Sequence, residues 1–457
     1  MPLSHSQAPV PIPAQAPAQA PASAHAPAIL NEPSQPALLG QAIAELASTP
    51  SSANNLIQRS LEAARKHLNL QVAYLSEFED NESVFRYVDA PGLEHLAKPG
   101  DRKSLDDVYC RHILAGRLPE LIPDTAQEPL AKAMPITQAV PIGAHVSVPI
   151  QLEDGEVYGM FCCLGPNADA SLNERDLQVM RCFADMAGAE VAQQREIEAI
   201  NEARKGRIEI ILGHDLIDIL YQPIWNTQHQ RAIGFEALSR FRSEEKKSPD
   251  VWFAEAAEVG LGLELELHVI AKALAGLNSL PDGSYLTLNC SPWTALDERL
   301  YELLQNHPLD RLVIELTEHD PLEDPAELTR RLAPLRAAGL RLAIDDAGAG
   351  YSGLQQILEL KPDIIKLDRF FVSSIDSDPS RQALATALAT FSRNIDCLMV
   401  AEGVENSAEL RMLEMIGFQN IQGYLLGRPT RLEKLVDAGV KVGDTEGSEA
   451  GQDKADC

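Results

Sequence analysis

The sequence predicts an α/β protein in which an α+β domain precedes a TIM-like (β/α)8 barrel. Three observations predict it. The chain has 457 residues, enough for two or three domains that each bury a core. Its first half contains strand-like runs joined by a hairpin and flanked by helical segments. Its second half alternates eight short apolar runs with helical segments over more than 200 residues, the pattern of a parallel barrel.

The composition of the chain argues against several classes of function. Hydrophobic residues make up 45% and charged residues 23%, the balance of a globular protein. The formal charge of −28 argues against DNA or RNA as a partner, because carboxylates repel a phosphate backbone. The seven cysteines include no CxxC pair, so neither a zinc ribbon nor a disulfide framework is indicated. No segment has the roughly 18 apolar residues of a membrane span, and no Lys or Arg precedes Arg59, so we expect a cytoplasmic protein without a signal peptide.

Both ends of the chain are expected to be disordered. Residues 1–37 are rich in Pro and Ala and have too few large apolar side chains to form a core. Residues 437–457 are acidic and Gly-rich, without apolar periodicity. These two segments are therefore predicted to be tails on a folded region.

The first domain is predicted over residues 38–195. Helical patterns at 38–49 and 57–68 precede strand-like runs at 71–78 and 83–89, and residues 145–165 form two β-rich runs around a Glu-Asp-Gly turn. This stretch resembles a GAF domain, a module that senses small molecules, in DVYCRHILAG, LPELIPDTAQ and GEVYGMFCCLG. The resemblance implies a small ligand of unknown identity. Cys110 lies where some sensing domains place a reactive residue, and inert packing is the other interpretation.

A connecting helix is predicted over residues 196–212. It continues a helical pattern that starts near Asn173 and contains no proline. Apolar residues at helical spacing, such as Leu177, Met180 and Phe183, favour packing of its first half on the first domain. The second half is more polar, and a two-chain coupling helix remains an alternative there.

The barrel is predicted over residues 213–436. Its strands are expected at 217–222, 232–241, 285–290, 311–316, 340–346, 363–368, 397–402 and 421–426. Almost every run ends in a polar or charged residue, and the carboxyl ends of barrel strands meet at one mouth. A ring of carboxylates there requires cations, and oxygen ligands suit Mg²⁺ or Mn²⁺. The ring lacks Cys and His, which argues against zinc.

The same region resembles the EAL domain of cyclic di-GMP phosphodiesterases. The signature is Glu236-Ala237-Leu238, and the matching pieces, in the expected order, are YQPI, LNCS, ELTE, DDAGAGYSGL, KLD, AEGVE and QGYLLGRP. The resemblance implies hydrolysis of cyclic di-GMP to linear 5′-pGpG by a two-metal in-line mechanism, controlled by the first domain. It also implies a homodimer. A non-catalytic cyclic di-GMP receptor that signals to a protein partner is the alternative.

The resemblance also implies a role for each matching residue. One metal is assigned to Glu236, Asn289, Glu315 and Asp345, and a second to Asp345, Asp346 and Glu402. Catalytic roles fall to Glu402, Lys366 and Asp346, with Lys366 orienting the attacking water or meeting phosphate charge. Substrate contacts, or their support, are assigned to Gln222, Leu238, Arg240, Asp368, Glu405 and Gln422.

Structural roles are the alternatives for several of these residues. Asp345 and Asp346 could cap a helix, and Gln222 and Gln422 could be core amides with internal partners. Lys366, Glu402 and Glu405 could form an ion-pair network without a catalytic role. The loop after the aspartate pair also departs from the family, because Ala347 and Ala349 stand where Phe and often Thr are usual.

Overall fold

The computed structural model describes residues 53–317, 324–347 and 353–437. The predicted tails, apart from residue 437, the helix expected at 38–49, and Ala349 of the loop after the aspartate pair lie outside the described residues. The chain divides into two compact units, with the division between Arg195 and Glu196. Each unit is described by itself.

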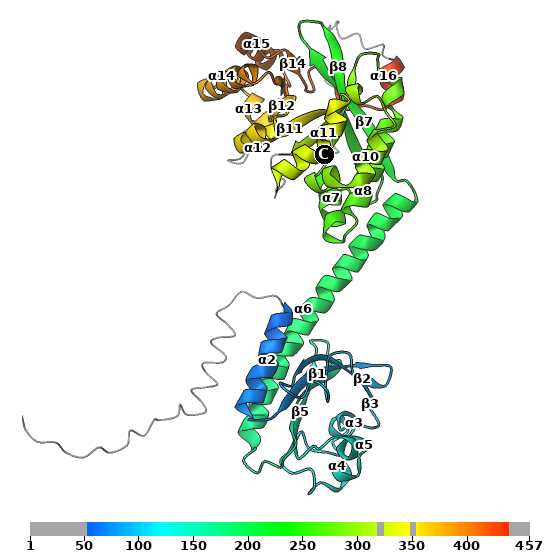
Figure 1. Cartoon of the computed structure of the whole chain (residues 1–457), viewed down its shortest axis with the longest axis vertical. Coiled ribbons are helices and arrows are strands. Elements are labelled where there is room, and N and C mark those ends of the chain that lie inside the picture. The colour runs from blue at the N-terminus through cyan, green and yellow to red at the C-terminus, as the bar shows by residue number, and fades with distance from the viewer. Residues whose placement is uncertain (1–52, 318–323, 348–352, 438–457) are drawn as a thin grey trace, which may run out of the picture. The chain divides into compact units, whose positions relative to one another are not determined.

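The first unit is built on one antiparallel sheet of six strands in the order β3-β2-β1-β6-β5-β4. Figure 1 labels β1, β2, β3 and β5 of this sheet. The strands are β1 (Val72–Glu79), β2 (Glu82–Asp89), β3 (Arg102–Ser104), β4 (Leu121–Ile122), β5 (Ala144–Gln151) and β6 (Val157–Gly165). The helices are α2 (Ala53–His67), α3 (Cys110–Leu114), α4 (Pro129–Ala133), α5 (Pro135–Ala139) and the first part of α6 (Glu174–Gly213). The predicted α+β architecture is confirmed.

The two faces of this sheet carry separate cores, because successive strand residues point to opposite faces. Ala73 and Leu75 of β1 pack with α2 and with Leu177, Met180 and Phe183 of α6. On the other face, Val72 and Tyr74 belong to a core that includes Cys110 of α3. A contact with Cys162, together with burial, raises the pKa of the Cys110 thiol, which favours packing over reactivity.

Helix α6 is continuous over 40 residues and contributes to both units. Its first part belongs to the core of the first unit, and its last part places Ile208 and Ile211 in a small core of the second unit with Trp252. Among the described helices, none combines the length and apolarity that crossing a membrane requires.

The second unit is a closed barrel with the strand order β10-β11-β12-β13-β14-β7-β8-β9. The strands are β7 (Ile217–Asn226), β8 (Arg231–Phe241), β9 (Tyr285–Asn289), β10 (Leu312–Thr317), β11 (Arg341–Ala347), β12 (Ile364–Leu367), β13 (Leu398–Ala401) and β14 (Asn420–Ile421). Each overlaps one of the eight predicted runs. The predicted TIM-like barrel is confirmed.

One strand departs from the all-parallel pattern. β7 is antiparallel to both of its neighbours, β8 and β14. The chain between Asn226 and Arg231 forms a tight hairpin connection, whereas parallel strands need a crossover of a dozen or more residues. The reversal places Gln222 of β7 directly opposite Glu236 of β8.

Helices surround the barrel and bury their apolar sides against its outer face. The longer ones are α7 (Pro249–Glu258), α8 (Gly262–Ala275), α10 (Glu298–Leu304), α11 (Pro325–Ala337), α12 (Gly353–Leu360), α14 (Pro379–Asn394) and α15 (Ser407–Ile416). Short segments are α9 (Pro292–Leu296), α13 (Arg369–Val372), α16 (Leu432–Asp437), η1 (Leu277–Ser279) and η2 (Leu309–Arg311). The residues of this outer core differ from those that fill the barrel interior.

Candidate functional site

The barrel interior has an apolar layer and, one step further along the strands, a polar layer. The apolar layer contains Ile224, Tyr285, Val313, Ala343, Ile364 and Val400. Side chains two residues apart on a strand share a face, so the polar residue two positions after each of the last four also points inward. Those residues are Glu315, Asp345, Lys366 and Glu402. The polar ends of the predicted strands therefore converge because of strand periodicity.

Lys366 lies at the centre of this polar layer and is only 1% exposed. Its Nζ is 2.6 Å from Oε1 of Glu402, 3.0 Å from Oε2 of Glu315, 3.2 Å from Oδ2 of Asp345 and 3.5 Å from Oε2 of Glu236. Four carboxylates from four different strands or strand ends thus share one ammonium group. Such a group of buried charges requires compensation from cations.

Glu236 is held by amide side chains as well as by Lys366. Asn289 Nδ2 donates to Glu236 Oε1 at 3.2 Å, and Gln422 Nε2 donates to Glu236 Oε2. Gln422 Nε2 is also 3.3 Å from Oε1 of Gln222, whose own amide donates to the Gly427 carbonyl at 3.1 Å. Gln422 therefore orients the Glu236 carboxylate directly, and Gln222 helps to hold Gln422 in place.

Two groups of carboxylates are spaced to hold metal ions. Glu236, Glu315 and Asp345 form one, and Asp345, Asp346 and Glu402 form the other. Within each group, one ligand atom per residue lies within 4.8 Å of the others. With every carboxyl group ionised, the five carboxylates and the Lys366 ammonium together leave four negative charges, which two divalent cations would balance.

A buried oxygen supports the same conclusion. Glu315 Oε1 is buried without a hydrogen-bond partner among the described residues. An unsatisfied buried carboxylate oxygen is costly, and a hard cation is a natural partner for it. The residues present therefore fit a pair of oxygen-liganded divalent metals.

A local backbone distortion explains how Asp345 and Asp346 can belong to one group. Adjacent strand residues normally point to opposite faces. Here Asp346 has φ +56°, and the pairing between β11 and β12 shifts register between Ile344 and Ala347. A left-handed residue in a bulge redirects its side chain, and Asp tolerates this conformation better than most residues. The distortion lets both carboxylates share a site with Glu402.

Burial changes the pKa values of these carboxyl groups. Burial raises the pKa of Glu315 to about 8, and it also raises the pKa values of Asp345 and Glu402.

For Glu236, burial is outweighed by Lys366 and by the hydrogen bonds from Gln422 and Asn289, so its pKa is lowered. Burial disfavours the charged form of Lys366, yet the four carboxylates raise its pKa well above the usual value. The lysine therefore stays charged.

Metal binding by this site is expected to strengthen as pH rises. Glu315, whose pKa is raised to about 8, carries a proton near pH 7 in the metal-free protein, and a cation must displace that proton. The apparent Kd for Mg²⁺ should fall between about pH 6.5 and 8 and level off above about pH 8. Titration calorimetry in buffers of different ionisation enthalpy measures both the affinity and the released protons. A Kd that does not change with pH would contradict the protonated state of the cluster.

A cavity of about 770 Å³ opens next to Asn289. Leu238 and Arg240, both predicted to contact substrate, line it. They share a strand face with Glu236, because all three lie at alternate positions of β8. Trp293, which is 57% exposed, also lines the cavity, and it was not predicted from the sequence as a site residue. Its position just after LNCS was the available signal in the sequence.

Two predicted residues make contacts outside the carboxylate cluster. Asp368 Oδ1 accepts a hydrogen bond from the backbone N–H of Phe370 at 2.8 Å and caps α13. Glu405 Oε1 accepts from Arg369 at 2.6 Å, and the Glu405 side chain is about half exposed. Asp368 directly follows β12 and Glu405 comes four residues after β13, so both lie close in sequence to strand ends that carry the cluster.

Both units match known families. Residues 206–429 match the model of the EAL domain, and residues 52–191 match the model of the GAF domain. The chain is similar to the probable cyclic di-GMP phosphodiesterases PdeN (32% identity, 51% of this chain, 47% of the relative) and PdeD (30%, 49% and 44%) of Escherichia coli K12. It spans less than half the length of these two relatives.

One solved structure is similar over a larger part of the chain. The cGMP-bound form of the EAL enzyme Bd1971 matches 81% of this chain and 93% of its own, with a TM-score of 0.51. At 18% sequence identity, this similarity concerns the fold alone.

Proposed function

We propose that this chain, which has a GAF domain followed by an EAL domain, hydrolyses cyclic di-GMP to linear 5′-pGpG. One observation carries the proposal: two carboxylate groups that share Asp345 lie around a buried lysine at the barrel mouth. Relatives named as probable cyclic di-GMP phosphodiesterases support the choice of substrate.

The chain's own residues divide into metal ligands and residues that position them. The first metal would be held by Glu236, Asn289, Glu315 and Asp345, and the second by Asp345, Asp346 and Glu402. Mg²⁺ or Mn²⁺ in both positions would activate water and neutralise charge on the phosphate.

Gln422 and Gln222 keep the Glu236 carboxylate in its orientation. Lys366 keeps the carboxylates together and presents an ammonium to the reacting phosphate.

The substrate would lie in the cavity lined by Leu238 and Arg240, beside Asn289. Arg240 would bind a phosphate, because a guanidinium matches phosphate oxygens in charge and geometry. Water adds to one phosphorus, the bond from that phosphorus to the 3′ oxygen breaks, and the 3′ oxygen takes up a proton. The product keeps the phosphate on its 5′ side, as in 5′-pGpG. We also propose that the protein acts as a homodimer.

We further propose that the first unit regulates this reaction. It contains a cavity of about 150 Å³ with a mainly apolar lining that includes Tyr74, Phe85 and Tyr109. His145 also lines this cavity, and its Nδ1 is buried without a hydrogen-bond partner in the described part of the chain. A small ligand with an apolar body and one polar group fits these features.

The proposal is tested by incubating the full chain with cyclic di-GMP and Mg²⁺ or Mn²⁺ and following the product by chromatography. Linear 5′-pGpG that forms with metal and not with EDTA is the expected result. Binding of cyclic di-GMP can be followed separately by tryptophan fluorescence. Of the three tryptophans, Trp293 is the one that is exposed, and it lines the cavity. Quenching of its fluorescence without product over hours would instead indicate a cyclic di-GMP receptor.

A further inference from the structure

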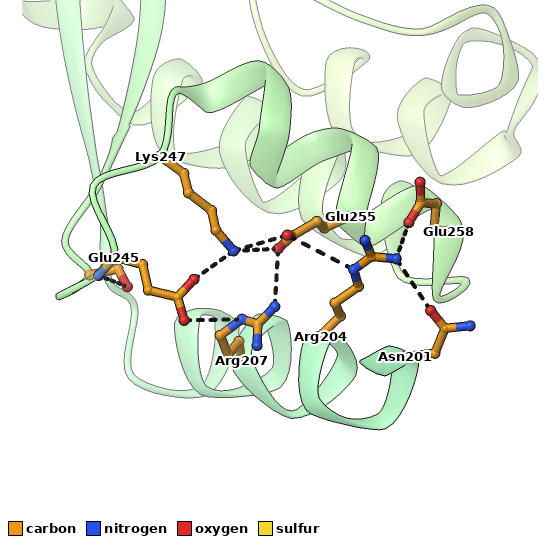
Figure 2. A network of polar contacts seen from close by, with 8 residues as sticks. Asn201, Arg204, Arg207, Glu245, Lys247, Glu255 and Glu258 are labelled. Atoms are coloured by element: carbon orange, nitrogen blue, oxygen red, sulfur yellow. Dashed lines mark hydrogen bonds and ion pairs between the residues drawn. The ribbon is translucent and has the colours of Figure 1, made fainter. Parts of the chain in front are cut away.

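Glu255 of α7 lies at the centre of an ion-pair network on the barrel unit (Figure 2). Its carboxylate is 2.9 Å from Nζ of Lys247, 3.5 Å from Nη2 of Arg207 and 3.9 Å from Nε of Arg204. Its side chain is 12% exposed, whereas those of the three cations are 23–31% exposed. Arg204 and Arg207 belong to α6, so the network joins the last part of α6 to α7.

Two more acidic residues extend the network. Glu258 of α7 pairs with Arg204, and Glu245, between β8 and α7, pairs with Arg207 and Lys247. Figure 2 shows these side chains pointing toward one another from α6, α7 and the segment that precedes α7. Connected ion pairs with partly buried members hold helices together more effectively than isolated surface pairs do.

Apolar contacts beneath the network hold the same two helices together. Trp252 of α7 is fully buried and belongs to one core with Ile208 and Ile211 of α6. Lys247 Nζ lies 4.8 Å from the centroid of the Trp252 ring. The last part of α6 and the inner face of α7 are therefore packed as one body within the barrel unit.

The opposite face of α7 forms a wall of the 770 Å³ cavity. Asp250, Ala254 and Ala257 line that cavity and repeat at helical spacing, as Trp252 and Glu255 do on the other face. Leu238, Arg240 and Asn289 line the same cavity. One helix thus contacts α6 with one face and bounds the proposed substrate site with the other.

We propose that Glu255 is a positioning residue, through which α6 sets the placement of α7 and hence the affinity of the cavity for the dinucleotide. This inference rests on the proposed function and adds a route for its regulation. The metal ligands come from strands and strand ends of the barrel, and α7 supplies none of them. A displaced α7 should therefore weaken substrate binding and leave the chemical step unchanged.

The test compares Arg204→Ala/Arg207→Ala with Arg204→Lys/Arg207→Lys in the full chain. The alanine pair should raise KM for cyclic di-GMP by about threefold to tenfold. The Kd, measured by Trp293 fluorescence with Ca²⁺ in place of Mg²⁺, should rise by the same factor. Its kcat should stay within about twofold of the parent. The lysine pair keeps both charges and should restore most of the affinity. Glu255→Gln, which keeps the side-chain shape, gives a second measure if the alanine pair does not fold.

Arg331→Ala is the matched control, because Arg331 of α11 pairs with Glu298 and Glu327, and neither α10 nor α11 lines the cavity. It should leave KM unchanged. An unchanged KM in the alanine pair and in Glu255→Gln, a lower kcat at constant KM, or an equal rise in the control would each overturn the inference. A parent protein that neither binds nor cleaves cyclic di-GMP would instead overturn the proposed function, on which the inference rests.

Discussion

Replacing Glu236 by Ala is expected to lower kcat for cyclic di-GMP by at least about a thousandfold. The substitution removes a ligand atom from one carboxylate group and leaves the amides of Asn289 and Gln422 without their acceptor. The fold should persist, because Glu236 raises the pKa of Glu315 and its loss relieves that repulsion. Turnover under saturating substrate and metal measures the effect.

Glu302→Ala is the control, since Glu302 is an exposed acid on α10 of the same unit. It should match the parent in kcat and in thermal unfolding. Circular dichroism should show that Glu236→Ala keeps its secondary structure. If the folded variant turned over substrate at a rate near that of the parent, Glu236 would not be a metal ligand in the reaction.

Replacing Lys366 by Met is expected to destabilise the metal-free protein by about 3 kcal/mol at pH 8. The substitution leaves the carboxylates of Glu236, Glu315, Asp345 and Glu402 without their shared ammonium. Buried carboxyl groups with raised pKa values are charged above those values, so their repulsion is greatest at high pH. At about pH 6 Glu315, whose pKa is about 8, holds a proton, so the repulsion and the loss of stability should be smaller. Urea unfolding in EDTA at both pH values measures it.

Added Mg²⁺ should recover much of this stability, because divalent cations replace the missing positive charge. Turnover should stay about a hundredfold or more below that of the parent, since the ammonium beside the reacting phosphate is gone. Lys205→Met, at an exposed position of α6, is the control and should change neither quantity. If Lys366→Met and the parent were equally stable in EDTA at pH 8, the four carboxylates around Lys366 would not repel one another as proposed.

Much of the barrel could be predicted because its strands are short apolar runs that end in polar residues. The reversal of β7 was missed, although the four residues between Asn226 and Arg231 are too few for a parallel crossover. Hydrophobic periodicity gives strand position and says nothing of strand direction. Loop length was the signal that could have supplied the direction.

The carboxylate cluster was predictable in membership and less so in geometry. Each predicted carboxylate of the two metal groups lies in one of the two groups that the structure brings together. The left-handed backbone at Asp346, which makes this possible for adjacent residues, depends on pairing between β11 and β12. The contact of Gln422 with Glu236 depends on strand order around a closed barrel. Such long-range contacts are not encoded in local spacing.

The central lysine competes with metal ions for the same carboxylate oxygens. Because the Lys366 ammonium already lies among the oxygens that the two ions would take, loading is a cation exchange and not a simple entry. The side chain must give up contacts before the incoming ions can make theirs. Replacing these contacts would lower the net affinity of the site for the two ions, compared with a site whose carboxylates held no ammonium.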